Sequence, residues 1–402
     1  MKVLFTTIFV LFLGGLVVAQ DNDKNWFQVY GFAMTDIGYN FNQIHPDWFD
    51  VVRPTKLPTM ENQYGTDGNA YFSVRQTRFG VKSGTQTALG ELFTQFEWEL
   101  FGTGVDAGQT TIRLRHAYGE LGQFGVGQYW SPFMDIDVFP NSVEYWGPNG
   151  MAFFRNVQFR YMPIKGDTRL TFALERPGAS ADAGMYSGRI ELSGIEARFP
   201  VPDLSAEYRS GHDWGYVELA GIVRYMKWED QLEDQIDLSG DAIGWGLNLS
   251  SNIKLGKDNL VRLSVLYGAG VQNYMNDAPV DVAIDTTEGN GVAIPLLGVV
   301  AFLEHNWSEK FATAIGYSML DIDNTNGQTY DAFSMGSYAL GNIIYYPVQD
   351  VMMVCEVQWG KRENLGDFPD PNDPQADMYL KTADILKIQF SFKYNFSHKM
   401  FY

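Results

Sequence analysis

Apolar and polar residues alternate along much of the chain, so that one face of each predicted strand differs from the other. In the segment from Ile243 to Leu255, apolar residues occupy the odd-numbered positions apart from Ser251, and small or polar residues occupy most of the positions between them. The segments 260–269 and 386–396 repeat this alternation. Helical periodicity is hard to find beyond residue 20, so the sequence predicts an all-β protein.

Strand length and the connections between strands favour a membrane barrel over a water-soluble sandwich, which would also alternate. The alternating segments run for about ten residues, the length of a tilted membrane strand. Short connections such as 256–259 and 307–310 alternate with long ones such as 42–68 and 364–382, and this arrangement is typical of membrane barrels. We therefore predict a transmembrane antiparallel β-barrel of about sixteen strands with long external loops.

Closure of such a barrel requires the last strand to pair with the first, near Phe27–Phe41, because an open strand edge in lipid leaves backbone groups unpaired. The segment from Leu386 to Phe396 is the predicted last strand. Two predicted strands, Phe124–Tyr129 and Gly188–Pro200, fit the alternation least well.

Residues 1–19 are predicted to be a secretory signal peptide. Lys2 precedes an apolar stretch, and Val17-Val18-Ala19 offers small residues at the expected cleavage site. A membrane-spanning helix is the alternative, but the stretch is short for that purpose and no basic cluster follows it. The remaining chain has no apolar run of about 18 residues and no linker that divides it. Residues 20–402 are therefore predicted to form one outer-membrane domain.

Charge and cysteine content exclude several classes of function. The formal net charge of −19 argues against nucleic acid as a partner, because nucleic acid requires a basic surface. The single cysteine, Cys355, rules out an intramolecular disulfide framework and a cysteine metal cluster. No cofactor and no metal are expected. Acidic residues gather at 229–237 and 367–377; we interpret them as solvated loop charge, and divalent cations bridging to lipopolysaccharide are the alternative.

Charged residues fall on the polar faces of two neighbouring predicted strands. Glu97 and Glu99 share one polar face, and Arg113 and Arg115 share the next. If the apolar faces meet lipid, these side chains point into the lumen, where charged side chains set selectivity. Adjacent acidic and basic rows would create a field across the pore that orients charged solutes. The alternative is that they form cross-strand ion pairs that stiffen the wall.

Further basic residues are placed in the lumen, because a basic side chain that faces lipid near the bilayer centre is costly. This predicted set is Arg160, Arg169, Arg224, Lys254, Arg262, Lys387 and Lys393. Inward-facing Glu218 and Glu356 offset it in part. The faces of Arg75 and Arg78 stay open, since the two residues lie on opposite sides of one strand. An arginine-rich lumen would favour anions locally, whatever the overall charge.

The segment from Trp130 to Gly150 is long, aromatic and rich in turn residues, and it contains Asp135 and Asp137. By analogy with the loop at this place in porins of about sixteen strands, we expect it to fold into the channel as a constriction loop. Asp135 and Asp137 are then candidate constriction residues. An ordinary external loop is the alternative.

Short motifs spread over nearly the whole mature chain point to a family. They are Tyr30-Gly31-Phe32, Arg75-Gln76-Thr77-Arg78-Phe79-Gly80, Arg113-Leu114-Arg115-His116-Ala117-Tyr118-Gly119, Gly127-Gln128-Tyr129-Trp130-Ser131-Pro132-Phe133, Asp213-Trp214-Gly215, Leu219-Ala220-Gly221, Gly316-Tyr317-Ser318 and Tyr394-Asn395-Phe396. In this order they resemble the DcaP-like outer-membrane porins. The resemblance implies a sixteen-stranded barrel, assembly as a homotrimer, loops folded into the pore, and passage of small organic anions such as dicarboxylates.

One departure from that pattern lies at the end of the chain. Ser397 to Tyr402 follow Phe396, whereas such barrels usually end on a terminal aromatic residue. Either Tyr402 takes that role or the last strand is longer than predicted.

The function predicted from these observations is that of a porin in a Gram-negative outer membrane, in contact with lipid and lipopolysaccharide. It would pass small hydrophilic solutes, preferably organic anions, by passive diffusion. An adhesin or structural barrel that acts through its external loops is the alternative. Enzyme activity is not expected, because none of the five histidines belongs to a recognisable constellation with a nucleophile; His116 falls on a predicted lipid face.

Overall fold

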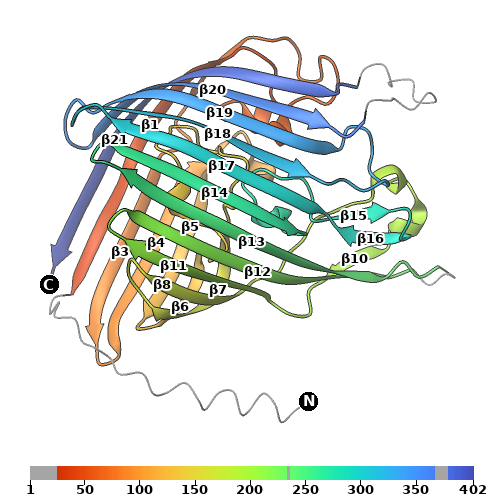
Figure 1. Cartoon of the computed structure of the whole chain (residues 1–402), viewed down its shortest axis with the longest axis horizontal. Helices are drawn as coiled ribbons and strands as arrows, with labels where there is room; N and C mark the ends of the chain where they lie inside the picture. The colour runs from red at the N-terminus through yellow and green to blue at the C-terminus, as the bar shows by residue number, and fades with distance from the viewer. Residues whose placement is uncertain (1–24, 233–235, 367–378) are drawn as a thin grey trace.

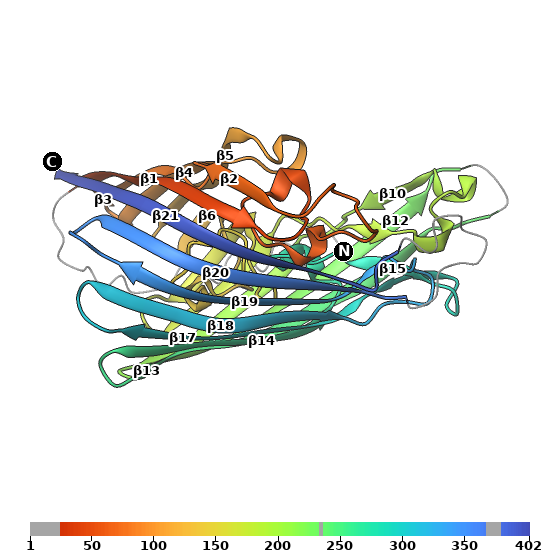
Figure 2. The same cartoon turned by 90° about the horizontal axis from the view of Figure 1, so that it is seen from above.

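The computed structural model describes residues 25–232, 236–366 and 379–402. Within these residues, sixteen antiparallel strands close into a barrel (Figures 1 and 2). The strands of the barrel are β1 (Trp26–Asn40), β3 (Arg78–Thr87), β4 (Gly90–Phe101), β5 (Thr110–Leu121), β6 (Phe124–Trp130), β7 (Arg155–Ile164), β8 (Arg169–Glu175), β11 (Asp203–His212), β12 (Gly215–Asp230), β13 (Gly240–Leu255), β14 (Asn259–Ala269), β17 (Pro295–Asn306), β18 (Phe311–Ile322), β19 (Phe333–Tyr345), β20 (Val351–Asn364) and β21 (Thr382–Phe401). The predicted all-β membrane barrel is confirmed.

Shorter elements lie in the connections. They are the strands β2 (Asn69–Ser73), β9 (Ala181–Asp182), β10 (Ile195–Arg198), β15 (Val282–Asp285) and β16 (Asn290–Ala293), and the 3-10 turns η1 (Pro46–Trp48), η2 (Pro54–Lys56), η3 (Gly104–Asp106), η4 (Ile136–Val138), η5 (Gly184–Tyr186), η6 (Ile190–Leu192) and η7 (Gln272–Tyr274). Among the described residues, no helix is long and apolar enough to cross a membrane. The predicted signal peptide, residues 1–19, lies outside the described residues.

The alternation read from the sequence separates an outer face from an inner face. On β13, Leu247 and Leu249 are each 53% exposed on the outside, whereas Asn248 and Ser250 are buried inside the barrel. Outward apolar side chains of this kind suit a hydrocarbon environment, and inward polar ones suit a wet lumen. The pattern follows from the period of two along a strand.

The barrel closes between β1 and β21. Their register runs without a break from Trp26 opposite Phe401 to Asn40 opposite Lys387. The last strand therefore continues past Phe396 to Phe401, which explains the extra residues at the end of the sequence. The start of β1 at Trp26 and the end of β21 at Phe401 lie at the end of the barrel where the short turns are, and the long loops lie at the other end (Figure 1).

The two weakest strand predictions had different outcomes. Phe124–Tyr129 is confirmed as part of β6. The prediction of a full strand over Gly188–Pro200 is wrong, because most of that segment forms η6 and the short strand β10. β10 pairs only with the outer end of β12, from Ile195 opposite Asp230 to Arg198 opposite Lys227. The neighbouring place in the barrel belongs to β11.

Arg75 and Arg78 both point inward, although they lie three positions apart. The chain leaves the sheet between β2 and β3, so the alternation is reset there. Arg75 is buried and pairs with Asp50, whose Oδ2 accepts a hydrogen bond from Nε at 2.9 Å. Arg78 pairs with Glu99 at 3.1 Å. The sequence left the faces of these two residues undecided, and in the structure both side chains face the lumen.

The placement of His116 on the lipid face is wrong. Glu97 of β4 pairs with His116, but Trp98 pairs with Leu114, so Arg115 is an extra residue in the ladder. Such a bulge reverses the alternation for the residues that follow. His116 and Tyr118 are consequently buried inside the barrel, while Leu114 is 47% exposed on the outside.

Candidate pore constriction

The segment between β6 and β7, which we call the inward loop (Ser131–Phe154), lies inside the barrel. Phe133, Val138 and Met151 are at most 1% exposed. The loop reaches the opposite wall, where the Gly150 N–H donates to Ser318 of β18 at 2.8 Å. The predicted inward folding of Trp130–Gly150 is confirmed, and the alternative of an ordinary external loop is wrong.

Ion pairs and hydrogen bonds hold the inward loop near its start and near its centre. Near its centre, Glu144 pairs with Lys387 of β21 at 3.0 Å, and neither side chain is exposed. Nearer its start, Asp135 accepts hydrogen bonds from Arg209 and Tyr216, both at 2.6 Å. Since buried carboxylates are costly without partners, these contacts fix the loop across the lumen.

Two further loops fold inward and meet it. Arg53, from the loop between β1 and β2, pairs with Asp277 of the loop between β14 and β17 at 2.8 Å. The indole N–H of Trp146 donates to the Asn276 carbonyl at 2.7 Å. Three segments that are distant in the sequence thus join inside the barrel and narrow it.

Backbone packs directly on backbone where the inward loop crosses β17. A Cβ atom built on Gly298 would lie 2.2 Å from the Gly150 carbonyl oxygen, so only glycine fits there. We expect Gly298→Val to push the inward loop off the wall, lower stability by about 1–3 kcal/mol and increase single-channel conductance. Gly341→Val on β19 is the matched control, because a Cβ there meets nothing within 4 Å. Equal conductance in the two variants would contradict this packing role.

The four charged residues predicted on β4 and β5 come together, chiefly as ion pairs. Arg115 contacts Glu97 and Glu99, each at 2.7 Å. Glu99 also accepts a hydrogen bond from the Tyr145 hydroxyl of the inward loop. Arg113 differs from the rest, because within the described part of the chain its single ion-pair contact, to Glu99, is 4.0 Å long. Arg115 therefore forms the cross-strand ion pairs that were the alternative to a field across the pore. Arg113 instead keeps its charge available to the lumen.

The other predicted residues lie on the same inner wall in separate contacts. Arg169 pairs with Glu218 at 2.8 Å and with Glu207 at 3.2 Å. Arg262 pairs with Glu304 at 2.6 Å and also donates to the Asp137 carbonyl.

Arg160 and the Asp137 carboxylate complete the predicted set. Arg160 is bound by the Gln158 side chain and the Trp130 carbonyl rather than by a carboxylate. The Asp137 carboxylate pairs with Arg209 at 2.6 Å. Arg209 was not predicted, although it follows the alternation of β11.

A cavity of about 500 Å³ opens where the three inward loops meet β5 to β8. Four arginines line it, Arg53, Arg113, Arg155 and Arg176, and we call it the arginine cavity. The Arg155 side chain is 6% exposed, and its Nη1 has no hydrogen-bond partner. Arg176 is exposed. Unsatisfied guanidinium groups that face a cavity are suited to carboxylates and other oxyanions.

The carboxylates that contact these arginines are already bound by several partners. Glu99 is not exposed, and it is shared by Arg78, Arg115 and Tyr145. Asp277 accepts bonds from Arg53 and from the backbone and hydroxyl of Thr55. Burial, and next the charge of Glu99, raises the pKa of Tyr145, so the phenol stays protonated. The surface of the cavity is therefore positive.

Three of the cavity arginines were not predicted from the sequence. Arg53 lies in a loop, Arg176 directly follows β8, and Arg155 is the first residue of β7. By the alternation of β7, Arg155 would face lipid, since Asn156 and Gln158 are buried inside. A basic residue on an apparent lipid face beside a long loop was the available signal, although Arg155 is already paired with Trp130 of β6 in the wall.

Comparison with known proteins decides the family. The model of the DcaP outer membrane protein family matches residues 18–371. The chain belongs to the DcaP outer membrane protein family. No curated protein matches it significantly. Membership of the DcaP family and the barrel fold make it an outer-membrane protein of a channel type, and this family and fold are those of channels rather than of enzymes.

Solved structures share the fold of this DcaP family member. The outer membrane channel DcaP of Acinetobacter baumannii is 20% identical and has a TM-score of 0.76, with 95% of this chain and 100% of that chain covered. An anion-selective porin from Comamonas acidovorans is 11% identical, with a TM-score of 0.59 over 92% of this chain and 100% of that chain. OmpT of Vibrio cholerae is 12% identical, with a TM-score of 0.55 over 95% of this chain and 100% of that chain.

Proposed function

We propose that this protein is a passive diffusion channel for small hydrophilic organic anions, and that the arginine cavity is its selective constriction. The observation that carries the proposal is the lining of that cavity by four arginines. The carboxylates in contact with them are bound by other donors as well. A permeating anion would exchange part of its hydration for guanidinium contacts, while a cation would meet repulsion.

The predicted charged residues have two different roles in this proposal. Arg113 contributes directly to the field in the cavity, because it is only loosely paired. Arg115, Glu97 and Glu99 hold the wall and the inward loop in place through their mutual ion pairs.

The remaining predicted residues have the same two roles, holding the inward loop or contributing positive charge to the lumen. Asp135 and Asp137 fix the start of the inward loop through Arg209. Arg160, Arg169 and Arg262 line the lumen outside the arginine cavity and would extend a positive path along the wall.

Dicarboxylates are the proposed preferred solutes. Guanidinium groups bind carboxylates through two parallel hydrogen bonds, and several arginines in one cavity can hold two carboxylates of one molecule. A local positive charge inside a protein with a net charge of −19 would separate the selective region from the acidic exterior. DcaP family membership is consistent with a channel of this kind.

Assembly and processing complete the proposal. We propose a homotrimer in contact with outer-membrane lipid and lipopolysaccharide; OmpT of Vibrio cholerae has been solved in a trimer form. We also propose that residues 1–19 are removed as a signal peptide and that residues 20–402 form a single domain. Of the acidic residues at 229–237 and 367–377, those at 233–234 and all of the second cluster lie outside the described residues.

The test is the reversal potential of the purified protein in a planar bilayer under a KCl gradient. We expect discrete conductance steps and a reversal potential on the chloride side. A preference for potassium would overturn the anion proposal while leaving a channel. Absence of current from correctly folded protein would overturn the channel itself and favour an adhesin or structural barrel.

A further inference from the structure

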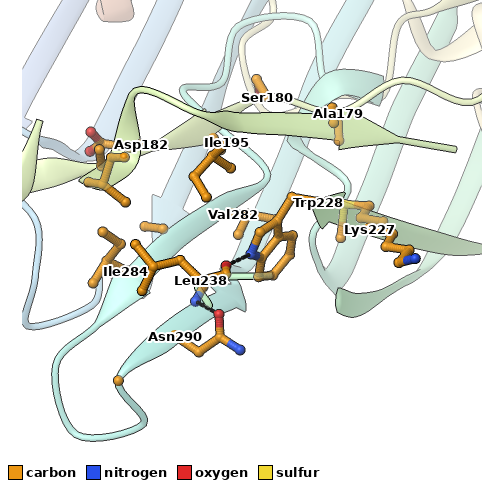
Figure 3. A pocket seen from close by; sticks show the side chains of 18 of the residues that line it. Ala179, Ser180, Asp182, Ile195, Lys227, Trp228, Leu238, Val282, Ile284 and Asn290 are labelled. Atoms are coloured by element: carbon orange, nitrogen blue, oxygen red, sulfur yellow. Dashed lines mark hydrogen bonds between the residues drawn. The ribbon is translucent and has the colours of Figure 1, made fainter. Parts of the chain in front are cut away.

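An apolar pocket lies at the end of the barrel that carries the long loops. It has a volume of about 350 Å³ and sits between the outer end of β12, β10 and the small sheet of β9, β15 and β16 (Figure 3). Its walls are mainly aliphatic and aromatic, with Ile195, Trp228, Leu238, Val282 and Ile284 pointing toward one another. Water in such a space gains few hydrogen bonds, so an apolar group should displace it readily.

The polar side chains of Trp228, Ser180 and Asp182 on the pocket wall are already bonded within the protein. The Trp228 indole N–H donates to the Leu238 carbonyl at 3.0 Å. The Ser180 hydroxyl donates to Asp281 at 3.1 Å, and Asp182 accepts the Gly184 N–H at 2.8 Å. A ligand would therefore be held by apolar contact rather than by hydrogen bonds.

The Trp228 ring is held in place by two glycines. A Cβ atom built on Gly240 would lie 2.6 Å from the ring, and one built on Gly291 would lie 3.0 Å from it. The alternation of β12 turns Trp228 inward, two positions beyond the buried Met226. The pocket thus opens toward the lumen side of the wall, and its aromatic face has a defined orientation.

The pocket adjoins the arginine cavity through two shared segments. Arg176 lines the cavity, and Ala179 to Ala183 line the pocket. On the other segment, Ala278 and Pro279 line the cavity, and Val282 to Ile284 line the pocket. Three residues of extended chain span about 10 Å. An organic anion with an apolar tail of that length would match the separation of the two sites along these segments.

We propose that the apolar pocket binds the aryl or alkyl part of amphipathic organic anions and presents their carboxylate to the arginine cavity. The channel would then capture such anions at its external mouth in preference to fully hydrophilic anions of equal charge. The inference rests on the proposed function, because the arginine cavity supplies the site for the carboxylate. The pocket itself depends only on the contacts described above.

The test is calorimetric titration of the whole protein in lipid nanodiscs with 4-phenylbutyrate and with butyrate, each corrected with empty nanodiscs. Burial of the phenyl ring should make 4-phenylbutyrate bind at least about tenfold more tightly than butyrate. Ala197→Phe, which places a ring in the pocket, and Trp228→Ala, which removes one wall, should each abolish most of this difference. Trp245→Ala is the matched control, because Trp245 is 41% exposed on the outer face of β13.

Equal affinity for the two acids, or a phenyl preference that persists in both pocket variants, would overturn the proposal. The uncharged 4-phenylbutanol separates this failure from a failure of the proposed function. One outcome is that 4-phenylbutanol binds in a Trp228-dependent manner while the wild-type channel shows no anion preference. In that case the pocket binds apolar groups, and the arginine cavity is not selective. If 4-phenylbutanol does not bind and the reversal potential still favours anions, the pocket assignment alone is overturned.

Discussion

Replacing Arg113 and Arg176 together by glutamate should convert an anion-selective channel into one that prefers cations. Both side chains line the arginine cavity. Arg113 has only a 4.0 Å contact with Glu99, and Arg176 is exposed, so folding should tolerate the change. In water, one unit charge about 7 Å from a permeating ion contributes about 0.6 kcal/mol.

The double replacement changes the cavity by four charge units, since each arginine becomes a carboxylate. With partial screening, this amounts to about 2 kcal/mol against a chloride ion, or roughly a 30-fold fall in its permeability, and the opposite change for potassium lowers the chloride-to-potassium permeability ratio further. The measurement is the reversal potential in a KCl gradient. Arg189→Glu with Lys257→Glu is the matched control, because it alters net charge equally at exposed positions away from the cavity. A similar shift in the control would mean that overall charge, not the cavity, sets selectivity.

Removal of the Lys387 charge should be the most destabilising single change at the inward loop. Lys387→Met leaves Glu144 as an unpaired carboxylate in a site where neither side chain is exposed. Breaking a buried ion pair by removing one partner costs about 3–5 kcal/mol. We expect a lower midpoint of thermal unfolding in detergent, and a larger, noisier conductance as the loop leaves the lumen.

Two comparisons make the Lys387 result interpretable. Lys254→Met removes an exposed lysine whose amine has only a 3.4 Å contact with a backbone carbonyl, and it should leave both readouts unchanged. Adding Glu144→Leu to Lys387→Met should recover part of the lost stability, because no buried charge remains. A Lys387→Met protein with wild-type unfolding and conductance would show that the pair does not hold the loop.

The alternation in the sequence predicts the barrel because it reports the environment of each side chain directly. On β13, lipid-facing apolar residues and lumen-facing serine and asparagine take alternate positions apart from Ser251, so the inner face is correctly identified. The same rule misplaces His116, since one extra residue at Arg115 shifts the ladder. A bulge changes no residue type in a recognisable way, and the period of two cannot reveal it.

The arginine cavity could not be predicted from the sequence, for a different reason. Its residues come from four loops and three strands that meet only in the folded barrel, and no periodicity links Arg53 to Arg155. What could be predicted was the inward course of the Trp130–Gly150 segment, through its length and its place between strands. The partner of each charge depends on tertiary contact, as Lys387 and Glu144 illustrate across the lumen.

The pairing of β1 with β21 has a consequence for biogenesis. The first strand of the wall, β1, borders β21 over its full length, so this hydrogen-bond partner is made only after the other strands of the barrel have been translated. Until then, either edge would expose backbone groups that lipid cannot satisfy. A closed barrel therefore requires export of the chain through β21, and a ribosome that stalls before residue 382 should yield a product whose first strand has no partner in the membrane.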